Sequence, residues 1–401
     1  MSTPNREKYA LKACRACNGP LRKFLDLGDS PVANRLLSDP LETVETYPLG
    51  LSRCMSCTLV QNATSLPGDL LFGADYAYMS SVSSAVKTNA RALAQRVAHR
   101  LDHNAMVLDV GSNDGTLQRA FSEQGLTCIG VDPSQIPVDY ARATGMTSYC
   151  APFDKNAAQD LTQKHGRFAA ITMSNVLAHV AAPQEMLEAA RQLLDPENGL
   201  LVIEFQSWEQ LVKLGAFDMV YHEHHSHFSL GSAATLLGAN GFSIFDVQNT
   251  NAQGGSLQLW CRPSGDHASP VNALITVEAA TLHTDESDLN LALETCRKSA
   301  LRFLQMMQTR KVVGYGAAAK TVTLLAALKS GLGIRCVGDK AETKITKFLP
   351  YGAIPILSPS QMLETNPDAI LIFAWNLADE ILPELQGREA WVPFPEFKRV
   401  Q

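Results

Sequence analysis

Four of the ten histidines in this chain fall within one short stretch, YHEHHSHFSL at residues 221–230. Imidazole binds metal ions, and it also acts as a general base near neutral pH. A metalloprotease helix of the form H-E-x-x-H would need a histidine at position 226, where the chain has Ser226. The zincin spacing is therefore absent, and three interpretations stay open at this point: a catalytic base with supporting groups, a metal site built from histidines alone, and a solvated loop that is rich in histidine.

Two pairs of cysteines have the spacing of metal ligands. Cys14 and Cys17 form one C-x-x-C pair, and Cys54 and Cys57 form another. Two intervening residues let both thiolates of a pair reach one ion, and four thiolates complete the tetrahedral shell of zinc. Because a closed shell leaves no position for a substrate, we expect one structural zinc per chain. The alternative is two redox-active pairs.

A glycine-containing loop follows a short apolar strand in VLDVGSNDGTL, residues 107–117. Gly111 lets the backbone turn sharply beside a ligand, and Asp132 closes the next strand, where a carboxylate commonly binds ribose hydroxyls. Asp109 and Asp114 would repel a pyrophosphate but attract the sulfonium of S-adenosylmethionine (SAM). The loop therefore favours SAM over NAD, with another Rossmann-like nucleotide site as the alternative. The expected cofactor contacts are Asp109, Gly111, Asn113, Asp114, Gly115 and Asp132.

A second glycine-containing loop, KVVGYGAAAKT at residues 311–321, has the same pattern of strand, turn and helix. A helix N-terminus accepts phosphate, Lys320 would add a cation, and Asp339 ends the next strand. Taken alone, this pattern is half of a dinucleotide site, for which NAD is the obvious ligand.

The elements that must position these residues alternate between short apolar strands and helices. Residues 105–262 and 311–397 both show this alternation, which is typical of a wound α/β sheet. Residues 84–103 and 271–310 have apolar residues at helical spacing and predict connecting helices. Residues 1–80 are rich in turn signals and contain the paired cysteines, so they predict a small loop-rich unit that needs a metal to fold.

The composition excludes several classes of partner. The 401 residues carry a formal net charge of −6 without any run of lysine or arginine, so neither nucleic acid nor an anionic membrane is expected. No apolar run approaches the ~20 residues that span a bilayer, and the N-terminus lacks the apolar core of a signal peptide. We expect a cytoplasmic protein whose nine cysteines stay reduced, as a monomer or weak dimer.

In their order along the chain, these motifs resemble a known family over nearly the whole length. The family is the SAM-dependent nucleotide-sugar C-methyltransferases, the deoxysugar 3-C-methyltransferases with an N-terminal zinc-binding domain. Besides the cysteine pairs, the resemblance is carried by LGDSPVANRLL (27–37), DVGSNDGTL (109–117), VDPS (131–134), NVLAHV (175–180), EFQ (204–206), YHEH (221–224), GGSL (254–257) and GYGAAAK (314–320).

The resemblance implies an α/β protein of three domains that enclose a nucleotide sugar with a 4-keto group. The expected domains are a small zinc-binding N-terminal domain (1–80), a central Rossmann-like SAM methyltransferase domain (81–265) and a C-terminal Rossmann-like α/β domain (266–401).

Methylation of carbon in such a sugar needs a carbanion equivalent. A ketone at C4 acidifies the hydrogen at C3, so a base can remove it and leave an enolate. The enolate then attacks the methyl group of SAM in line. The site must supply a base, a donor aimed at the developing oxyanion, and groups that position the sugar; no metal is required.

The resemblance assigns these roles to particular residues. His224 is implied as the base, with Glu223 and Tyr221 orienting it or contacting the sugar. His179 resembles a second active-site histidine that donates to the enolate, and it follows a strand at the sheet edge where ligands bind. The family also has a tyrosine in the active site, and Tyr76 is preferred over Tyr78 for that role. Tyr78 is then expected to contact the substrate, and Asn175 is expected to contact the cofactor.

Two departures from the family bear on the substrate. Family members often read YHEHLSYFSL where this chain has His225 and His227, and many read HGGS where it has Gln253 before Gly254 and Gly255. We expect these positions to alter which sugar is accepted. The expected substrate contacts here are His225, Gln253, Gly254 and Gly255.

The resemblance also implies that the C-terminal domain, through Lys320, helps to hold the nucleotide diphosphate of the sugar. A Rossmann-like scaffold that only covers the site is the alternative. Two other functions stay open: an O- or N-methyltransferase acting on another small molecule, and a non-catalytic zinc-containing protein that binds nucleotide sugars.

Overall fold

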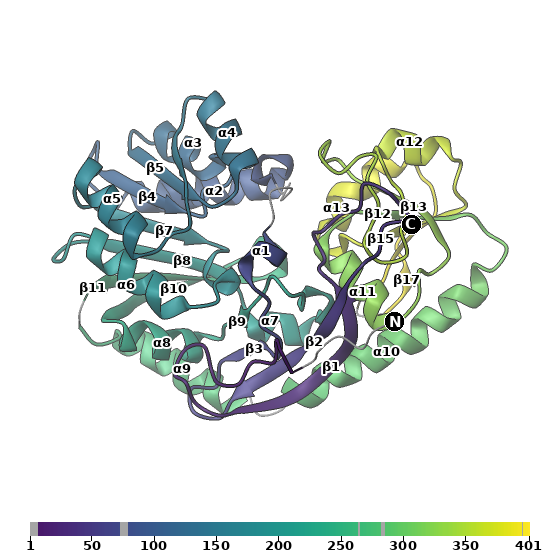
Figure 1. The fold of residues 1–401 in the computed structure, drawn as a ribbon, viewed down its shortest axis with the longest axis horizontal. Coiled ribbons are helices and arrows are strands. Elements are labelled where there is room, and N and C mark those ends of the chain that lie inside the picture. The colour runs from purple at the N-terminus through teal and green to yellow at the C-terminus, as the bar shows by residue number, and fades with distance from the viewer. Residues whose placement is uncertain (1–6, 73–78, 264, 282–284, 395) are drawn as a thin grey trace.

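A computed structural model describes residues 7–72, 79–263, 265–281, 285–394 and 396–401. The described residues form three sheets of four, seven and six strands, which confirms the mixed α/β fold. Figure 1 shows two lobes, each built on one of the larger sheets, with the long strands of the N-terminal segment running beneath and between them.

The seven-stranded sheet has the order β10-β11-β8-β7-β4-β5-β6. Five strands are parallel, and β11 and β10 add antiparallel pairs at one edge. The bounds are β4 (Met106–Val110), β5 (Thr127–Asp132), β6 (Thr147–Cys150), β7 (Ala170–Ser174), β8 (Leu200–Gln206), β10 (Phe242–Thr250) and β11 (Ser256–Pro263).

Helices cover both faces of this sheet because successive side chains of its strands point to opposite faces. Val107 is buried with residues of α2 and α3 on one face, and Leu108 is buried with residues of α5, α6 and α8 on the other. The bounds are α2 (Ser84–Ala98), α3 (Thr116–Glu123), α4 (Gln135–Ala143), α5 (Lys155–His165), α6 (Pro183–Leu193) and α8 (Leu230–Ala239). The helix expected over 84–103 is thus present and ends at Ala98.

The six-stranded sheet has the order β14-β13-β12-β15-β16-β17, in which only the pair β16–β17 is antiparallel. Its strands are β12 (Val312–Tyr315), β13 (Ile334–Gly338), β14 (Ile356–Leu357), β15 (Ala369–Ile372), β16 (Ala390–Val392) and β17 (Lys398–Arg399). Its helices are α11 (Ala319–Leu328), α12 (Pro359–Glu364) and α13 (Ala378–Ile381), with the 3-10 turns η5 (Trp375–Leu377) and η6 (Leu382–Leu385).

The N-terminal unit differs from the loop-rich expectation, which was wrong. Two long antiparallel strands dominate it, and the short helix α1 (Gly68–Leu71) follows them. One of the turn signals of this unit is GDSP at residues 28–31. It lies inside the first strand, where Gly28 adopts φ +87° beside a register shift, so it forms a β-bulge and not a turn. The sheet consists of β1 (Leu21–Pro31), β2 (Thr46–Cys54), β3 (Val60–Asn62) and β9 (Ser226–His227).

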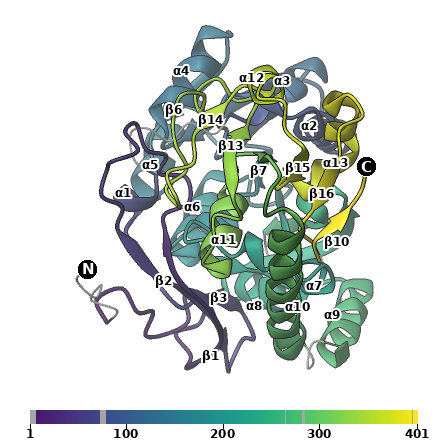
Figure 2. The same ribbon diagram turned by 90° about the vertical axis from the view of Figure 1, so that its right-hand side faces the viewer.

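Two helices replace the single one expected over 271–310. They are α9 (Ser269–Thr281) and α10 (Asp285–Met306), and residues 282–284 between them lie outside the described part of the chain. In Figures 1 and 2, α10 extends along the lobe of the six-stranded sheet, where its apolar side chains share one core with β1, β2, α7 and α11. The remaining elements are α7 (Trp208–Lys213), η1 (Ser80–Val82), η2 (Leu177–His179), η3 (Phe217–Met219) and η4 (Ala252–Gly254).

No helix within the described ranges combines the length and apolar character that crossing a membrane requires.

Candidate active site

His224 lies in the segment that follows β8, α7 and η3, which we call the histidine segment (residues 221–227). Its Nδ1 is 2.9 Å from the carbonyl oxygen of Met219, and its Nε2 is 2.7 Å from the hydroxyl of Tyr221. Because a carbonyl only accepts, we assign the proton to Nδ1, and Nε2 then accepts from the Tyr221 hydroxyl. The side chain therefore presents a lone pair on Nε2.

Burial keeps His224 neutral. Desolvation, followed by the neighbouring imidazoles of His179 and His227, holds the pKa of His224 well below its ordinary value of 6.5. The imidazole is therefore in its basic form at neutral pH, as a general base must be.

His179 meets His224 edge to face, with ring centroids 4.7 Å apart. Its Nδ1 is 2.9 Å from the backbone oxygen of Glu223, so this nitrogen also carries the proton. Burial lowers the pKa of His179 to about 4. In this neutral tautomer Nε2 has no proton to donate, so the implied donation to an enolate would require either a protonated ring or the other tautomer.

The side chain of Glu223 is fully buried and its partner is Asn34, not His224. Oε1 accepts from the backbone nitrogen and from Nδ2 of Asn34, both at 3.1 Å, while Oε2 has no partner among the described residues. Burial raises the pKa of Glu223 to about 7, against the opposing effects of its own backbone nitrogen and of the two Asn34 donors. Asn34 belongs to LGDSPVANRLL, but nothing in that motif alone indicated a contact with YHEH.

The N-terminal sheet holds the rest of the histidine segment. Asn62 donates from its backbone nitrogen to the oxygen of His225 at 3.1 Å and from Nδ2 to the oxygen of Tyr221 at 2.8 Å. Nε2 of His222 lies 3.3 Å from the oxygen of Pro48. The end of the segment forms β9, which pairs with β3 through Ser226 and His227. The zinc-binding unit is thus joined directly to the proposed base.

His225 and His227, which distinguish this chain from the family, point to different surroundings. The His227 ring stands 5.8 Å from that of His224, and burial lowers its pKa to about 3. Burial and the charge of Arg15 lower the pKa of His225 to about 3. His227 therefore lies against His224, whereas His225 lies within the range of the Arg15 charge.

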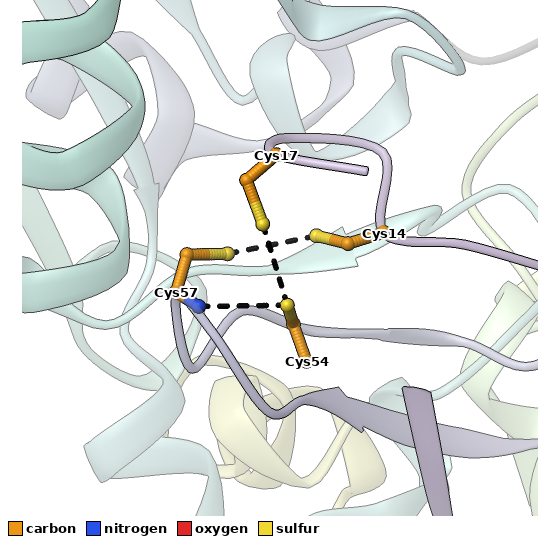
Figure 3. A group of neighbouring side chains, drawn as sticks. All are labelled: Cys14, Cys17, Cys54 and Cys57. Carbon is orange, nitrogen blue, oxygen red and sulfur yellow. Dashed lines mark hydrogen bonds between the residues drawn. The ribbon is translucent and has the colours of Figure 1, made fainter. Parts of the chain in front are cut away.

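The four cysteines converge as the spacing predicts (Figure 3). All four Sγ atoms lie within 4.8 Å of one another; Cys14 and Cys57 are 3.5 Å apart, and Cys17 and Cys54 are 3.4 Å apart. A zinc ion with Zn–S bonds of about 2.3 Å needs sulfurs about 3.8 Å apart. Across the described ranges no other group of three or more His, Cys, Asp or Glu side chains converges in this way. The set fits one structural zinc.

The first glycine loop has the backbone expected of a cofactor site. Gly111 adopts φ +69°, and a Cβ there would lie 2.4 Å from Cγ2 of Val176, so only glycine fits. The nitrogen of Asn113 donates to Oδ2 of Asp132 at 3.0 Å, which ties the loop to the end of β5. Burial raises the pKa of Asp132, and it raises that of Asp109 to about 7.

Two side chains of this loop bind the backbone of η1. Oδ1 of Asn113 accepts from the nitrogen of Ser80 at 2.9 Å, and Oδ2 of Asp114 accepts from that of Ser81 at 2.8 Å. Asp114 also accepts from Thr116 Oγ1 at 2.6 Å and is fully buried, so its contacts fasten the loop. Gly115 follows in a left-handed conformation at the start of α3. The two tyrosines predicted in the preceding segment, Tyr76 and Tyr78, lie outside the described residues.

Asn175 follows β7 with φ +57°, and its nitrogen donates to the oxygen of Glu204 at 2.7 Å. The next residue, Val176, is the one that a side chain at Gly111 would meet. The structure thus places Asn175 at the rim of the first glycine loop.

The GGS turn and Lys320 converge on Trp375, which sequence reasoning missed. A Cβ on Gly254 would lie 3.5 Å from the Trp375 ring, and the Lys320 ammonium lies 5.1 Å above it. Lys320 also donates to Oδ1 of Asn376, and burial lowers its pKa to about 8. The only available signal was that AWN follows an apolar strand at the carboxyl edge of a sheet.

Gln253 and Gly255 belong to the same turn as Gly254. Gln253 adopts φ +53°, and its backbone oxygen accepts from Nε2 of Gln206 at 3.1 Å. Gly255 adopts φ +122°, and a Cβ there would meet the side chain of Gln210 at 2.9 Å. These two residues therefore face α7 and the end of β8.

Side chains that follow β13 bind the backbone of the second glycine loop. Oδ2 of Asp339 accepts from the nitrogen of Ala317 at 2.8 Å, and Nζ of Lys344 donates to the oxygen of Ala317 at 2.8 Å. Lys344 also lies 3.7 Å from the Asp339 carboxylate. The Asp339 carboxylate and the backbone of Ala317 are already bonded within the protein, so these contacts do not support a binding site for NAD at this loop.

Comparison with known proteins matches three families along the chain. They are described as a zinc binding domain over residues 14–72, a methyltransferase domain over 83–247 and a C-methyltransferase C-terminal domain over 251–392. The chain is 31% identical to C-methyltransferase NovU of Streptomyces niveus, covering 96% of this chain and 95% of that protein.

Other similarities are confined to part of the chain. Ubiquinone biosynthesis O-methyltransferase of Histophilus somni is 31% identical over 27% of this chain and 50% of its own. The SAM-bound structure of magnesium protoporphyrin IX methyltransferase from Synechocystis PCC 6803 matches 44% of this chain and 79% of its own, at 19% identity and a TM-score of 0.34.

Removal of zinc should disable the histidine segment more than the cofactor loop. Gln61, which pairs with Ser226, also donates to Sγ of Cys14 at 3.3 Å, so loss of the metal loosens β3 and with it β9. For Cys54→Ala we expect no bound zinc, a loss of methyl transfer of at least about tenfold and SAM affinity within about threefold of wild type.

Metal analysis, radiolabel transfer and calorimetry measure these three quantities. Cys336→Ala, which removes a buried thiol in β13 outside the cluster, is the matched control and should keep its zinc. Full activity in a folded, zinc-free Cys54→Ala protein would contradict the expectation.

Acid should destabilise the protein through its buried neutral histidines. Burial lowers the pKa of His222 to about 4, so between pH 6.5 and 4 the unfolded chain binds a proton that the folded chain does not. The contribution of His222 is present above pH 6.5 and is lost as pH falls, by up to about 1.4 kcal/mol per pH unit.

His222→Gln can keep the donor to Pro48 without the titration. Its melting temperature should therefore fall less than that of wild type between pH 7.5 and pH 5, as followed by circular dichroism. His99→Gln, at the exposed end of α2, is the control and should follow wild type. Equal falls in wild type and His222→Gln would contradict the assignment.

Proposed function

Because the chain belongs to the SAM-dependent C-methyltransferase family and has the site for one structural zinc ion, we propose that it methylates C3 of a nucleotide-linked 4-keto-6-deoxyhexose. The observation that carries the proposal is the neutral His224, whose Nδ1–H is held by Met219 and whose Nε2 lone pair meets Tyr221. Transfer to carbon needs such a base, because the C3 hydrogen must leave before a methyl group can be accepted.

The proton path follows from this geometry. The Tyr221 hydroxyl donates to Nε2 across 2.7 Å, so it stands between the base and any substrate on that side. As the Tyr221 oxygen takes the C3 proton, its own proton passes to Nε2, and the electron pair of the C–H bond becomes the enolate. The imidazolium that forms keeps its Nδ1–H on the Met219 oxygen.

The first glycine loop is proposed to hold the cofactor. When bound, SAM supplies an electrophilic methyl group. Asp132 suits the ribose hydroxyls, and Asp109 lies beneath the turn at Gly111, where its oxygen accepts from Thr172 at 2.9 Å. We also propose that the sugar nucleotide contacts the C-terminal unit near Lys320 and Trp375, which is supported by their contact with each other and by the approach of Gly254.

His224→Asn tests the base. The amide nitrogen of asparagine can still donate to Met219, but no lone pair remains at the Nε2 position. We expect methyl transfer to fall by about 10² to 10⁴ with SAM affinity unchanged. In deuterated water, wild type should exchange the C3 hydrogen of the keto sugar nucleotide, and His224→Asn should not.

Proton NMR and mass spectrometry of the product measure both effects. His165→Asn, on α5 away from the histidine segment, is the matched control. A methyl group on oxygen or nitrogen of the product, or normal C3 exchange in His224→Asn, would refute the proposal.

A further inference from the structure

Asp218 is a buried carboxylate to which neither the sequence motifs nor the proposed chemistry assigns a role. It lies in η3, only 1% exposed, at the junction between the histidine segment and the C-terminal unit. Its Oδ2 accepts from Nε1 of Trp375 at 2.8 Å, and its Oδ1 has no partner among the residues that the structure describes. The positive charge of Lys320 acts on this carboxylate and lowers its pKa, against the larger effect of burial.

A buried carboxylate is energetically costly beside the apolar side chains that flank it in the sequence. Phe217 and Met219, on either side of Asp218, both pack in the core shared with α10 and α11. Removal of a carboxylate from water costs several kcal/mol unless partners replace the solvent, and an apolar side chain would avoid that cost. The position of Asp218 therefore calls for a function beyond packing.

The neighbouring residue supplies the carbonyl that holds the base. The chain from Ala216 to Val220 is a run of tight turns, in which Met219 donates to Ala216 at 3.0 Å and Val220 donates to Phe217 at 3.1 Å. Asp218 lies in the middle of this run, so its bond to Trp375 fixes the turn against the C-terminal unit. The orientation of the Met219 carbonyl, and hence of the His224 ring, depends on that turn.

We propose that Asp218 is a positioning residue, which through its hydrogen bond with Trp375 sets the Met219 carbonyl that orients His224. The proposal rests on the proposed role of His224 as the base. Trp375 lies against both Gly254 and Lys320. A substrate held there by the C-terminal unit would therefore contact the same tryptophan that binds Asp218. The C-terminal unit then has a part in aligning the base as well as in binding the sugar nucleotide.

Trp375→Phe tests the hydrogen bond between Trp375 and Asp218, because it keeps an aromatic ring beside Gly254 but removes the indole donor. We expect kcat to fall about tenfold or more, because a small displacement of a catalytic group costs up to about 10²-fold. SAM affinity and melting temperature should change little, and KM for the sugar should change less than kcat. Asp218→Ala should lower kcat similarly, and the double variant should lose no more than the worse single variant.

Trp391→Phe is the matched control. Trp391 is in the same unit and makes an indole-to-carboxylate bond of 2.7 Å to Glu389, whereas Trp375 makes its bond to Asp218. The kcat of Trp391→Phe should stay within about twofold of wild type, because Trp391 takes no part in the bond between Trp375 and Asp218.

The outcomes separate this proposal from the function on which it rests. An unchanged kcat in Trp375→Phe, an equal fall in Trp391→Phe, or additive losses in the double variant would overturn the role of Asp218 even if His224→Asn is inactive. Normal C3 exchange in His224→Asn would instead overturn the proposed function.

Discussion

The hydrogen bond from Nδ1 of His224 to the Met219 carbonyl is the contact on which the rest of the site depends. It selects the imidazole tautomer, and so it decides that Nε2 is the atom able to take a proton. His224 lies outside any helix or strand, and Met219 ends the single 3-10 turn η3, so the bond persists only if the surrounding chain is held from outside. The three sheets supply that support, each through a different contact with residues 217–227.

The N-terminal sheet contributes several of these contacts, which gives the structural zinc site a role outside the proposed chemistry. The zinc ligands fix β2 and β3, and β3 pairs with the histidine segment while Asn34 and Asn62 bind its side chains and backbone. This arrangement costs stability, because it buries neutral imidazoles and a carboxyl oxygen of Glu223 that has no partner among the described residues. Such local cost is characteristic of functional sites, where a preorganised geometry outweighs stability.

Local signals were enough to predict most strands of both large sheets, the cysteine cluster and the turn at Gly111, because apolar runs, ligand spacing and glycine geometry act over a few residues. The short strands β6, β16 and β17 were not predicted. The N-terminal strands were missed because a bulge at Gly28 carries residues typical of a turn. Asn34, Asp218 and Trp375 were missed for another reason. Their partners lie more than 150 residues away in sequence, and no local pattern encodes such a pairing. The influence of His225 and His227 on the substrate stays a prediction, because the structure shows only their surroundings.

The shared support of the histidine segment also constrains the order of events during synthesis. Its partners come from both ends of the chain: Asn34 is translated long before His224, and Trp375 long after it. On the ribosome, the first two sheets therefore emerge before the anchor at Asp218 can close. A nascent chain that has not reached Trp375 can form the cofactor loop but lacks the contact with Asp218, so alignment of the proposed base would wait for the C-terminal unit. Long-range closure of this kind slows folding.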